Sequence, residues 1–237
     1  MKQVTKDFQR RSLKLERIDT GDYTSEEYDR FLSEIRLVNR FAGDNRALKN
    51  SLLREIKREN LRRFSVLDVG AGSGELLRTI AGFARRSENR VALCGLELNA
   101  RSAESILEES RDFGEIKSVR GDARALPFAD NSFDYAICSL FTHHFTDENI
   151  IRILTEMSRV ARRKIFVIDL HRHKMAYLFY QLFCAAFRIS PLVVEDGSLS
   201  ILRSFTPGEL KSLGKIANLK NVSVERHFPF RLVLSGS

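Results

Sequence analysis

The sequence predicts an α/β fold in which a doubly wound, mostly parallel sheet ends in an antiparallel hairpin. Short apolar runs alternate with longer amphipathic segments between residues 64 and 170, and two more apolar runs lie close together near the end of the chain. Runs that lack a polar face are typical of parallel strands covered by helices on both sides. The 237 residues are enough for one domain with a full hydrophobic core.

The first part of the chain predicts helices. Residues 25–61 are charged and helix-favouring, with apolar residues near helical spacing, and Gly43-Asp44-Asn45 interrupts them. We therefore expect two helices joined by a turn. We expect residues 1–61 to form a helical cap and residues 62–237 to form the main domain.

The middle of the chain supplies the parallel strands and the helices between them. Each apolar run has the length of a strand, and each segment between them has the pattern of an amphipathic helix. The expected strands are 64–70, 91–98, 116–122, 133–140 and 164–170, and the expected helices are 75–85, 100–111 and 147–160.

An apolar insertion of about residues 171–205 follows the fifth strand. Its segment 175–187, "MAYLFYQLFCAAF", is more apolar than an exposed helix should be. One interpretation is a helix packed on the core, and the other is a lid over a hydrophobic substrate. A further helix is expected from Pro207, with Thr206 as its N-cap, followed by the hairpin strands 221–227 and 228–234.

Composition limits the possible partners. The net charge is +8, but the basic residues are scattered in short groups next to apolar runs, which is typical of a solvated surface, so a nucleic-acid partner is not expected. Cys94, Cys138 and Cys184 lack the spacing of a metal or disulfide site, which favours a reduced, cytoplasmic setting. The start of the chain has no signal-peptide core, and the longest apolar stretch is too short to span a membrane.

Three features at successive strand ends predict a nucleoside site. Gly70, Gly72 and Gly74 lie between the first strand and the next helix, where a bare backbone allows a ligand to come close. Glu97 ends the second strand, where such folds place an acid against ribose hydroxyls, and Asp122 ends the third. Glu75 stands at the helix N-terminus that a pyrophosphate would occupy, which favours a nucleoside without phosphates.

The motifs "VLDVGAGSGEL", "GLELN", "VRGDARALPFADNSFDYAICSLFTHHF" and "FVIDL" resemble those of class I S-adenosylmethionine-dependent methyltransferases, in order and in spacing. The resemblance covers Val66 to Leu170, and the terminal hairpin fits the seven-stranded, Rossmann-like sheet of that family. It implies S-adenosylmethionine as cofactor. The glycine loop, including Ala71, would then lie under the methionine portion and the ribose, with Asp68 supporting the cofactor's amino end.

The same resemblance implies roles for the other strand ends. Glu97 would hold the ribose hydroxyls and Leu98 would pack on the adenine. Asp122 with Ala123 would read the adenine amino edge. Cys138 and Ser139 would line the cofactor near its sulfonium.

The segment after the fourth strand indicates which class of molecule accepts the methyl group. It lacks the patterns of base-modifying and of metal-dependent catechol methyltransferases, so no metal is expected. "LFTHHF" is similar to the quinone-biosynthesis type, and weaker likenesses elsewhere point to a bacterial group found with type III polyketide synthases. A phenol with a pKa near ~10 needs a base, and His143 or His144 would serve, with His144 slightly favoured of the two. The alternative is that one histidine only fixes the loop by hydrogen bonds.

The leading hypothesis is therefore O-methylation of a phenolic or polyketide-type hydrophobic small molecule in the cytoplasm. C-methylation of a quinone-like ring, an RNA-associated methyltransferase and a noncatalytic cofactor-binding subunit stay open as alternatives. The sequence does not define the oligomeric state.

Overall fold

The computed structural model describes residues 8–237, and the first seven residues of the expected cap lie outside this range. Seven strands form one sheet in the order β3-β2-β1-β4-β5-β7-β6. The first five strands run parallel, while β7 is antiparallel to β5 and to β6, which confirms the predicted fold class. The strands are β1 (Arg63–Val69), β2 (Arg90–Glu97), β3 (Ile116–Arg120), β4 (Phe133–Ser139), β5 (Ala161–Leu170), β6 (Ser223–His227) and β7 (Arg231–Gly236).

Helices cover both faces of the sheet, as expected from strands without a polar face. Because side chains alternate along a strand, Tyr135 and Ile137 of β4 join the core on one face, while Ala136 and Cys138 join the core on the other. The first face is covered by α3 (Asp44–Leu48), a π-helical turn (Lys49–Leu53), α4 (Arg54–Arg58), α5 (Glu75–Arg86) and α6 (Ala100–Glu109). The second is covered by α7 (Asp147–Val160) and α10 (Pro207–Ile216).

Helix boundaries follow local capping chemistry. The Thr206 hydroxyl accepts a hydrogen bond from the Glu209 backbone N–H, and the Glu209 carboxylate accepts one from the Thr206 backbone N–H, so α10 begins where the sequence predicts. Gly43, with φ +92°, ends α2 (Ser25–Ala42) in the left-handed region, and α3 begins at the next residue. The expected turn is therefore a single glycine.

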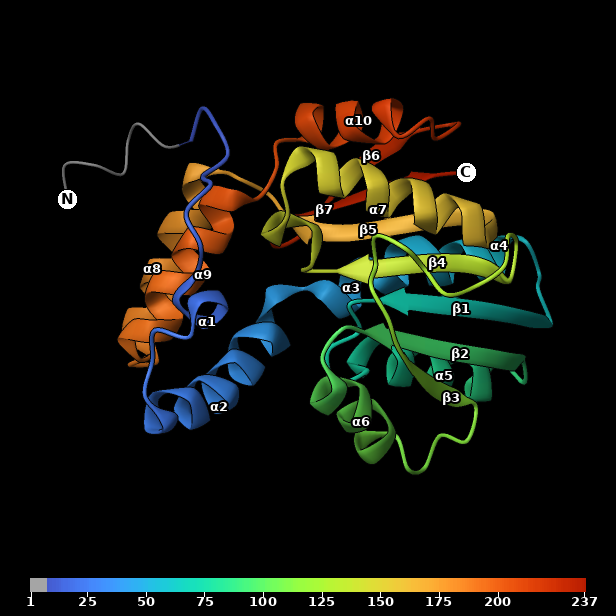
Figure 1. Ribbon diagram of the computed structural model, residues 1–237, viewed down its shortest axis with the longest axis horizontal. Coiled ribbons are helices and arrows are strands. Elements are labelled where there is room, and N and C mark those ends of the chain that lie inside the picture. Colours follow the sequence, from blue (N-terminus) through green and yellow to red (C-terminus); the bar gives the residue numbers. More distant parts are fainter. Residues whose placement is uncertain (1–7) are drawn as a thin grey trace.

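The remaining helices stand beyond the carboxyl ends of the strands. These are α1 (Arg17–Thr20), α2, and the insertion helices α8 (Lys174–Ala186) and α9 (Pro191–Arg203). Figure 1 shows β1, β2 and β4 pointing toward the side on which α2, α8 and α9 stand, and α9 contacts both α1 and α2. The role of the insertion as a lid, and the division at residue 62, stay predictions. In residues 8–237 no helix has both the length and the apolar character needed to cross a membrane.

Candidate active site

A cavity of about 250 Å³ lies at the carboxyl ends of β1 and β4. The strand order reverses between these two strands, so the loops that follow them leave in opposite directions and open a crevice. We call this the acid-lined cavity, because carboxylates of three residues reach its wall. Its lining is Asp44, Asp68, Gly70, Ala71, Gly72, Ser73, Glu75, Leu76, Ser139 and Leu140.

The glycine loop forms the floor of the acid-lined cavity. Gly70, Gly72 and Gly74 have φ of +71°, +58° and +81°, a region that other residues rarely adopt. A Cβ on Gly70 would collide with the Phe141 ring, whereas a Cβ on Gly72 would meet nothing within 4 Å. The space beside Gly72 is therefore free for a ligand to approach the backbone.

Asp68 is a buried carboxylate on this cavity. It is 2% exposed, and its Oδ1 has no hydrogen-bond partner within residues 8–237. Burial, together with the charge of Glu97, raises the pKa of Asp68 to about 8. Ser139 Oγ is buried and unpartnered on the same wall, again within the part of the chain described. Buried polar atoms without partners are rare in folded proteins, so these two point to a bound polar ligand.

Glu97 fastens the glycine loop to the end of β2. Its Oε1 accepts a hydrogen bond from Gly72 N at 2.6 Å, and its Oε2 accepts one from Leu98 N at 3.2 Å. Burial raises the pKa of Glu97 against the opposing effect of these two bonds. The Leu98 side chain beside it is 61% exposed and offers an apolar contact surface.

Asp122 and Ala123 follow β3, which ends at Arg120, and they lie in different settings. Asp122 accepts hydrogen bonds from the Arg124 backbone and side chain, and its Oδ2 lies 2.7 Å from Arg124 Nη2. These bonds lower the pKa of Asp122. Ala123 is buried in the core. Sequence reasoning missed Arg124, whose position two residues after Asp122 was the available signal.

Cys138 differs from Ser139, with which it was paired in the sequence expectation. Cys138 is fully buried in the hydrophobic core, and burial raises the pKa of its thiol well above the usual value. Ser139 instead lines the acid-lined cavity. The reason is the alternation of side chains along β4, which sends neighbours to opposite sides. The thiol therefore has the setting of a structural cysteine.

The two histidines after β4 also differ. His143 is buried, and its Nδ1 lies 2.7 Å from Oδ1 of Asp169, which is fully buried at the end of β5. Burial alone would raise the pKa of Asp169, but the His143 charge and hydrogen bonds from His143 and Thr142 outweigh it and lower the pKa to about 2. His144 is half-buried, and its Nδ1 lies 3.3 Å from Asp19 Oδ2. Neither histidine is among the residues that line the acid-lined cavity, although the loop that carries both begins at Leu140, which does line it. Sequence reasoning did not identify Asp169 as the partner of His143.

Glu16 lies next to both imidazoles. Ligand atoms of Glu16, His143 and His144 lie within 4.8 Å of one another, a spacing that a metal ion could bridge. The guanidinium of Arg203 lies 3.8 Å from Glu16 and donates to the backbone carbonyls of both histidines. Because Arg203 already supplies positive charge at this point, we interpret the cluster as an ionic network that holds the N-terminal segment against the loop after β4.

The other two carboxylates of the acid-lined cavity come from α3 and α5. Asp44 pairs with Arg231 of β7, whose Nε lies 2.6 Å from Asp44 Oδ1. Glu75 accepts a hydrogen bond from Asn45 Nδ2 at 2.8 Å. Because Arg231 balances the charge of Asp44, the carboxyls of Asp68 and Glu75 remain to face a ligand. A positively charged ligand would draw Asp68 into its ionised form, whereas a phosphate would meet only acceptor oxygens. From the sequence, Asp44 was expected only to form part of a turn.

A group of aromatic side chains lies outside the lining of the cavity, on segments next to Asp44 and Arg231. We call Phe41, Phe179, Phe183, Phe187 and Phe230 the aromatic wall. Ring centroids are 5.8 Å apart for Phe41 and Phe183, 4.5 Å for Phe183 and Phe187, and 5.9 Å for Phe179 and Phe230. Phe41 lies at the end of α2, three residues before Asp44, and Phe230 precedes Arg231, so both ends of the wall adjoin the Asp44–Arg231 pair.

Comparison with known proteins gives a consistent picture. Residues 66–164 match a family model described as a methyltransferase domain. The ubiquinone/menaquinone biosynthesis C-methyltransferase UbiE of Rickettsia felis is 29% identical over 158 residues, which cover 64% of this chain and 61% of that protein. The chain thus matches about three fifths of the length of that relative.

Two solved structures share the fold. Magnesium protoporphyrin IX methyltransferase (ChlM) from Synechocystis PCC 6803, with bound SAH, has a TM-score of 0.61 at 12% identity and covers 92% of this chain and 97% of its own. An S-adenosylmethionine-dependent methyltransferase from Aquifex aeolicus has a TM-score of 0.56 at 15% identity, covering 77% of this chain and 87% of its own.

Proposed function

We propose that this chain, whose residues 66–164 form a class I S-adenosylmethionine-dependent methyltransferase domain, methylates a hydroxylated aromatic small molecule. The observation that carries the proposal is the acid-lined cavity at the switch point of the sheet, with its unpartnered Asp68 oxygen. A cofactor with a sulfonium and an ammonium group suits such a lining, and a phosphorylated nucleotide does not.

The cavity residues fit this cofactor. Asp68 and Ser139 offer buried oxygens that lack partners in the described part of the chain, so they would accept hydrogen bonds from the amino end and lie near the reacting centre. Glu97 would hold the ribose, since each carboxylate oxygen can accept a second hydrogen bond. Leu98 would pack on the adenine. When bound, the cofactor supplies an activated methyl group.

The residues expected to contact the adenine edge have the fewest free hydrogen-bonding groups in this site. Asp122 would have to share its carboxylate with Arg124, which already donates several hydrogen bonds to it. The buried Ala123 would contribute through its backbone. We therefore propose that Asp122, still hydrogen-bonded to Arg124, contacts the adenine edge. We expect Glu97 and Asp68 to contribute most of the affinity for the cofactor.

The aromatic wall supports an aromatic, hydrophobic acceptor. Its rings belong to α2, α8 and the β6–β7 turn, and Figure 1 shows these segments beyond the carboxyl ends of β1 and β4. Phe41, Phe179 and Phe187 keep more than half of their surface exposed, at 55%, 53% and 51%. A flat apolar molecule would cover these rings and gain roughly 25 cal/mol per Å² of apolar surface removed from water.

We assign the base to His143. Asp169 accepts the hydrogen of Nδ1, which leaves Nε2 as the basic nitrogen and would stabilise the imidazolium that forms. The low pKa of Asp169 keeps it ionised throughout. A phenol deprotonated by His143 is then the nucleophile that attacks the methyl group in line. His144, which pairs with Asp19, is the second candidate.

Oxygen is our first candidate for the methylated atom, because a phenolate keeps most of its charge there. A ring carbon is the second, and it is favoured by the likeness to proteins named C-methyltransferases. Both need the same deprotonation, so the base assignment serves either.

Turnover with a panel of hydroxylated aromatic compounds tests the proposal. We expect products heavier by one methyl group, and NMR of the product identifies the methylated atom. His143→Gln should lower kcat by about 10²- to 10⁴-fold while cofactor affinity is kept. His144→Gln tests the second candidate and should leave kcat close to that of the parent. Full turnover by the His143 variant would refute the base. Cofactor binding without transfer to any hydroxylated aromatic would refute the acceptor class.

A further inference from the structure

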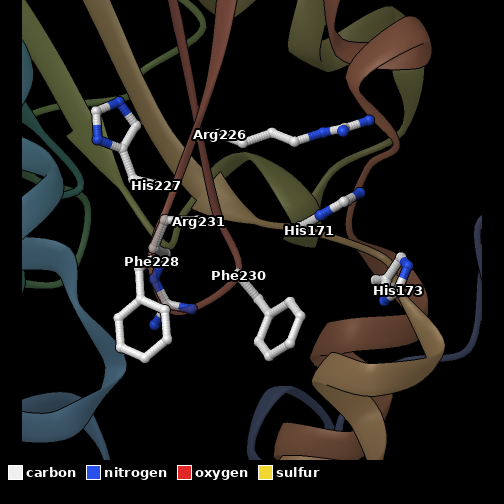
Figure 2. Close-up of a pocket in the computed structure, with 7 residues that line it drawn as sticks. All are labelled: His171, His173, Arg226, His227, Phe228, Phe230 and Arg231. Atoms are coloured by element: carbon white, nitrogen blue, oxygen red, sulfur yellow. The ribbon is translucent and has the colours of Figure 1, made fainter.

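A second cavity, of about 290 Å³, lies between the start of the insertion and the β6–β7 hairpin. Figure 2 shows His171 and His173 on one side of it and Phe228, Phe230 and Arg231 on the other, with Arg226 extending across from β6. Arg231 lines this second cavity and Asp44 lines the acid-lined cavity. The buried Asp44–Arg231 pair is therefore a wall that the two cavities share.

The second cavity carries positive charge. In residues 8–237 Arg226 has no carboxylate partner, whereas Arg231 is paired with Asp44 and Arg172 is paired with Glu209. The nearest acid along the strand, Glu225, follows the opposite side of β6 from Arg226. Its Oε2 is 3.1 Å from Arg54 Nη2 and 3.5 Å from Nε2 of His227, which also lines the cavity.

The charge of this cavity also acts on its histidines. The rings of His171 and His173 lie 5.3 Å apart. Burial lowers the pKa of His171 to about 4, and the charges of His173, Arg226 and Arg172 add to this effect. His171 is therefore neutral at neutral pH and acts as a hydrogen-bond donor, while Arg226 is the fixed charge.

The same cavity has an aromatic side. Phe228 and Phe230 project side by side from the β6–β7 turn in Figure 2. The Phe230 ring stacks near His173, with centroids 6.0 Å apart, and it also belongs to the aromatic wall through Phe179. A ligand with a flat ring and an anionic group would satisfy both sides, since the ring would lie on Phe230 and the anion would face Arg226.

We propose that the second cavity is a subsite for the methyl acceptor and that it binds a carboxylate on the aromatic ring, so that the acceptor is a hydroxylated aromatic acid. This inference rests on the proposed function. A guanidinium binds a carboxylate through charge-assisted hydrogen bonds, which are about twice as strong as neutral ones. The acid group held at Arg226 would orient the ring along the shared wall, with its hydroxyl toward the acid-lined cavity.

Calorimetry on the protein loaded with S-adenosylhomocysteine tests this subsite. The probes are 4-hydroxybenzoate and 1-hydroxy-2-naphthoate, each against its methyl ester. We expect each acid to bind about tenfold or more tightly than its ester. Arg226→Gln should remove that preference and leave the ester unchanged. Arg54→Gln removes the charge that pairs with Glu225 on the other side of β6. It should change neither the affinity for the acid nor the affinity for the ester.

The possible results separate failure of the subsite from failure of the proposed function. Equal binding of acids and esters to the intact protein, or a preference that survives Arg226→Gln, overturns the subsite. Competition by inorganic phosphate as strong as by the aromatic acids also overturns it, because the ring would then contribute nothing. Failure to bind S-adenosylhomocysteine at all would instead overturn the proposed function. Thermal melting of the Arg226 variant, an exposed surface change, verifies that it folds.

Discussion

Replacement of Asp68 by Asn should stabilise the protein while weakening its cofactor site. The pKa of Asp68 lies at about 8 in the fold against an ordinary 3.8, so the folded state holds a proton that the unfolded chain releases between these values. At about 1.4 kcal/mol per pH unit this amounts to roughly 6 kcal/mol of lost stability above pH 8. Relaxation of the site reduces it, and we expect about 1–3 kcal/mol.

The sign follows from linkage. An acid with a raised pKa contributes stability that is fully present below pH 3.8 and is lost as pH rises toward 8. Asn keeps the shape of the protonated acid without this loss. Urea unfolding of both proteins at pH 5 and pH 8 should therefore show a gain for Asp68→Asn that is larger at pH 8. A variant less stable than the parent, or a gain equal at both pH values, would refute the reasoning.

Asp169 provides the matched control, because it is equally buried but has a pKa lowered to about 2. Its contribution is present above pH 3.8 and is lost as pH falls through 2, so it is constant between pH 5 and 8. Asp169→Asn should cost about 2 kcal/mol at both pH values. A gain from this second variant would show that burial alone decides both signs.

The other predictions concern the loop, the core and a cap. Gly72→Ala should cost about 1 kcal/mol of stability from its positive φ but abolish most cofactor binding. Gly70→Ala should lower the stability more, because its Cβ collides with Phe141. Thermal melting measures the stability of both variants and calorimetry measures their cofactor binding. Thr206→Ala should cost about 1 kcal/mol in urea unfolding through loss of the capping box. Cys138→Ala should lower stability by about 1–2 kcal/mol and leave turnover unchanged, since the thiol lies in the core.

Most of the fold was accessible from local patterns. The helix predicted for 147–160 matches α7 at both ends, because Thr146 provides an N-cap that the sequence displays. The third strand ends at Arg120 rather than 122, since Asp122 bridges back to Ala125 in a tight turn. The fifth strand begins at Ala161, three residues early, because a strand can carry exposed basic side chains at its amino end.

Sequence patterns located only those cavity residues that lie at the end of a strand or directly after it. Gly70, Gly72, Asp68 and Ser139 lie where the strand ends require, and these four line one cavity. The Asp44–Arg231 pair joins residues 187 apart, and no local pattern announces such a contact. The same holds for Asp169, whose role depends on β5 lying beside β4.

The cofactor titration tests the central claim most directly. At pH 6.5 we expect S-adenosylmethionine to bind one site, and comparison of buffers with different ionisation heats should reveal release of nearly one proton, as Asp68 ionises against the cofactor's ammonium group. Asp68→Asn should bind at least about tenfold more weakly and release none. Absence of binding to the intact protein, or tight binding with no proton released, would contradict the account.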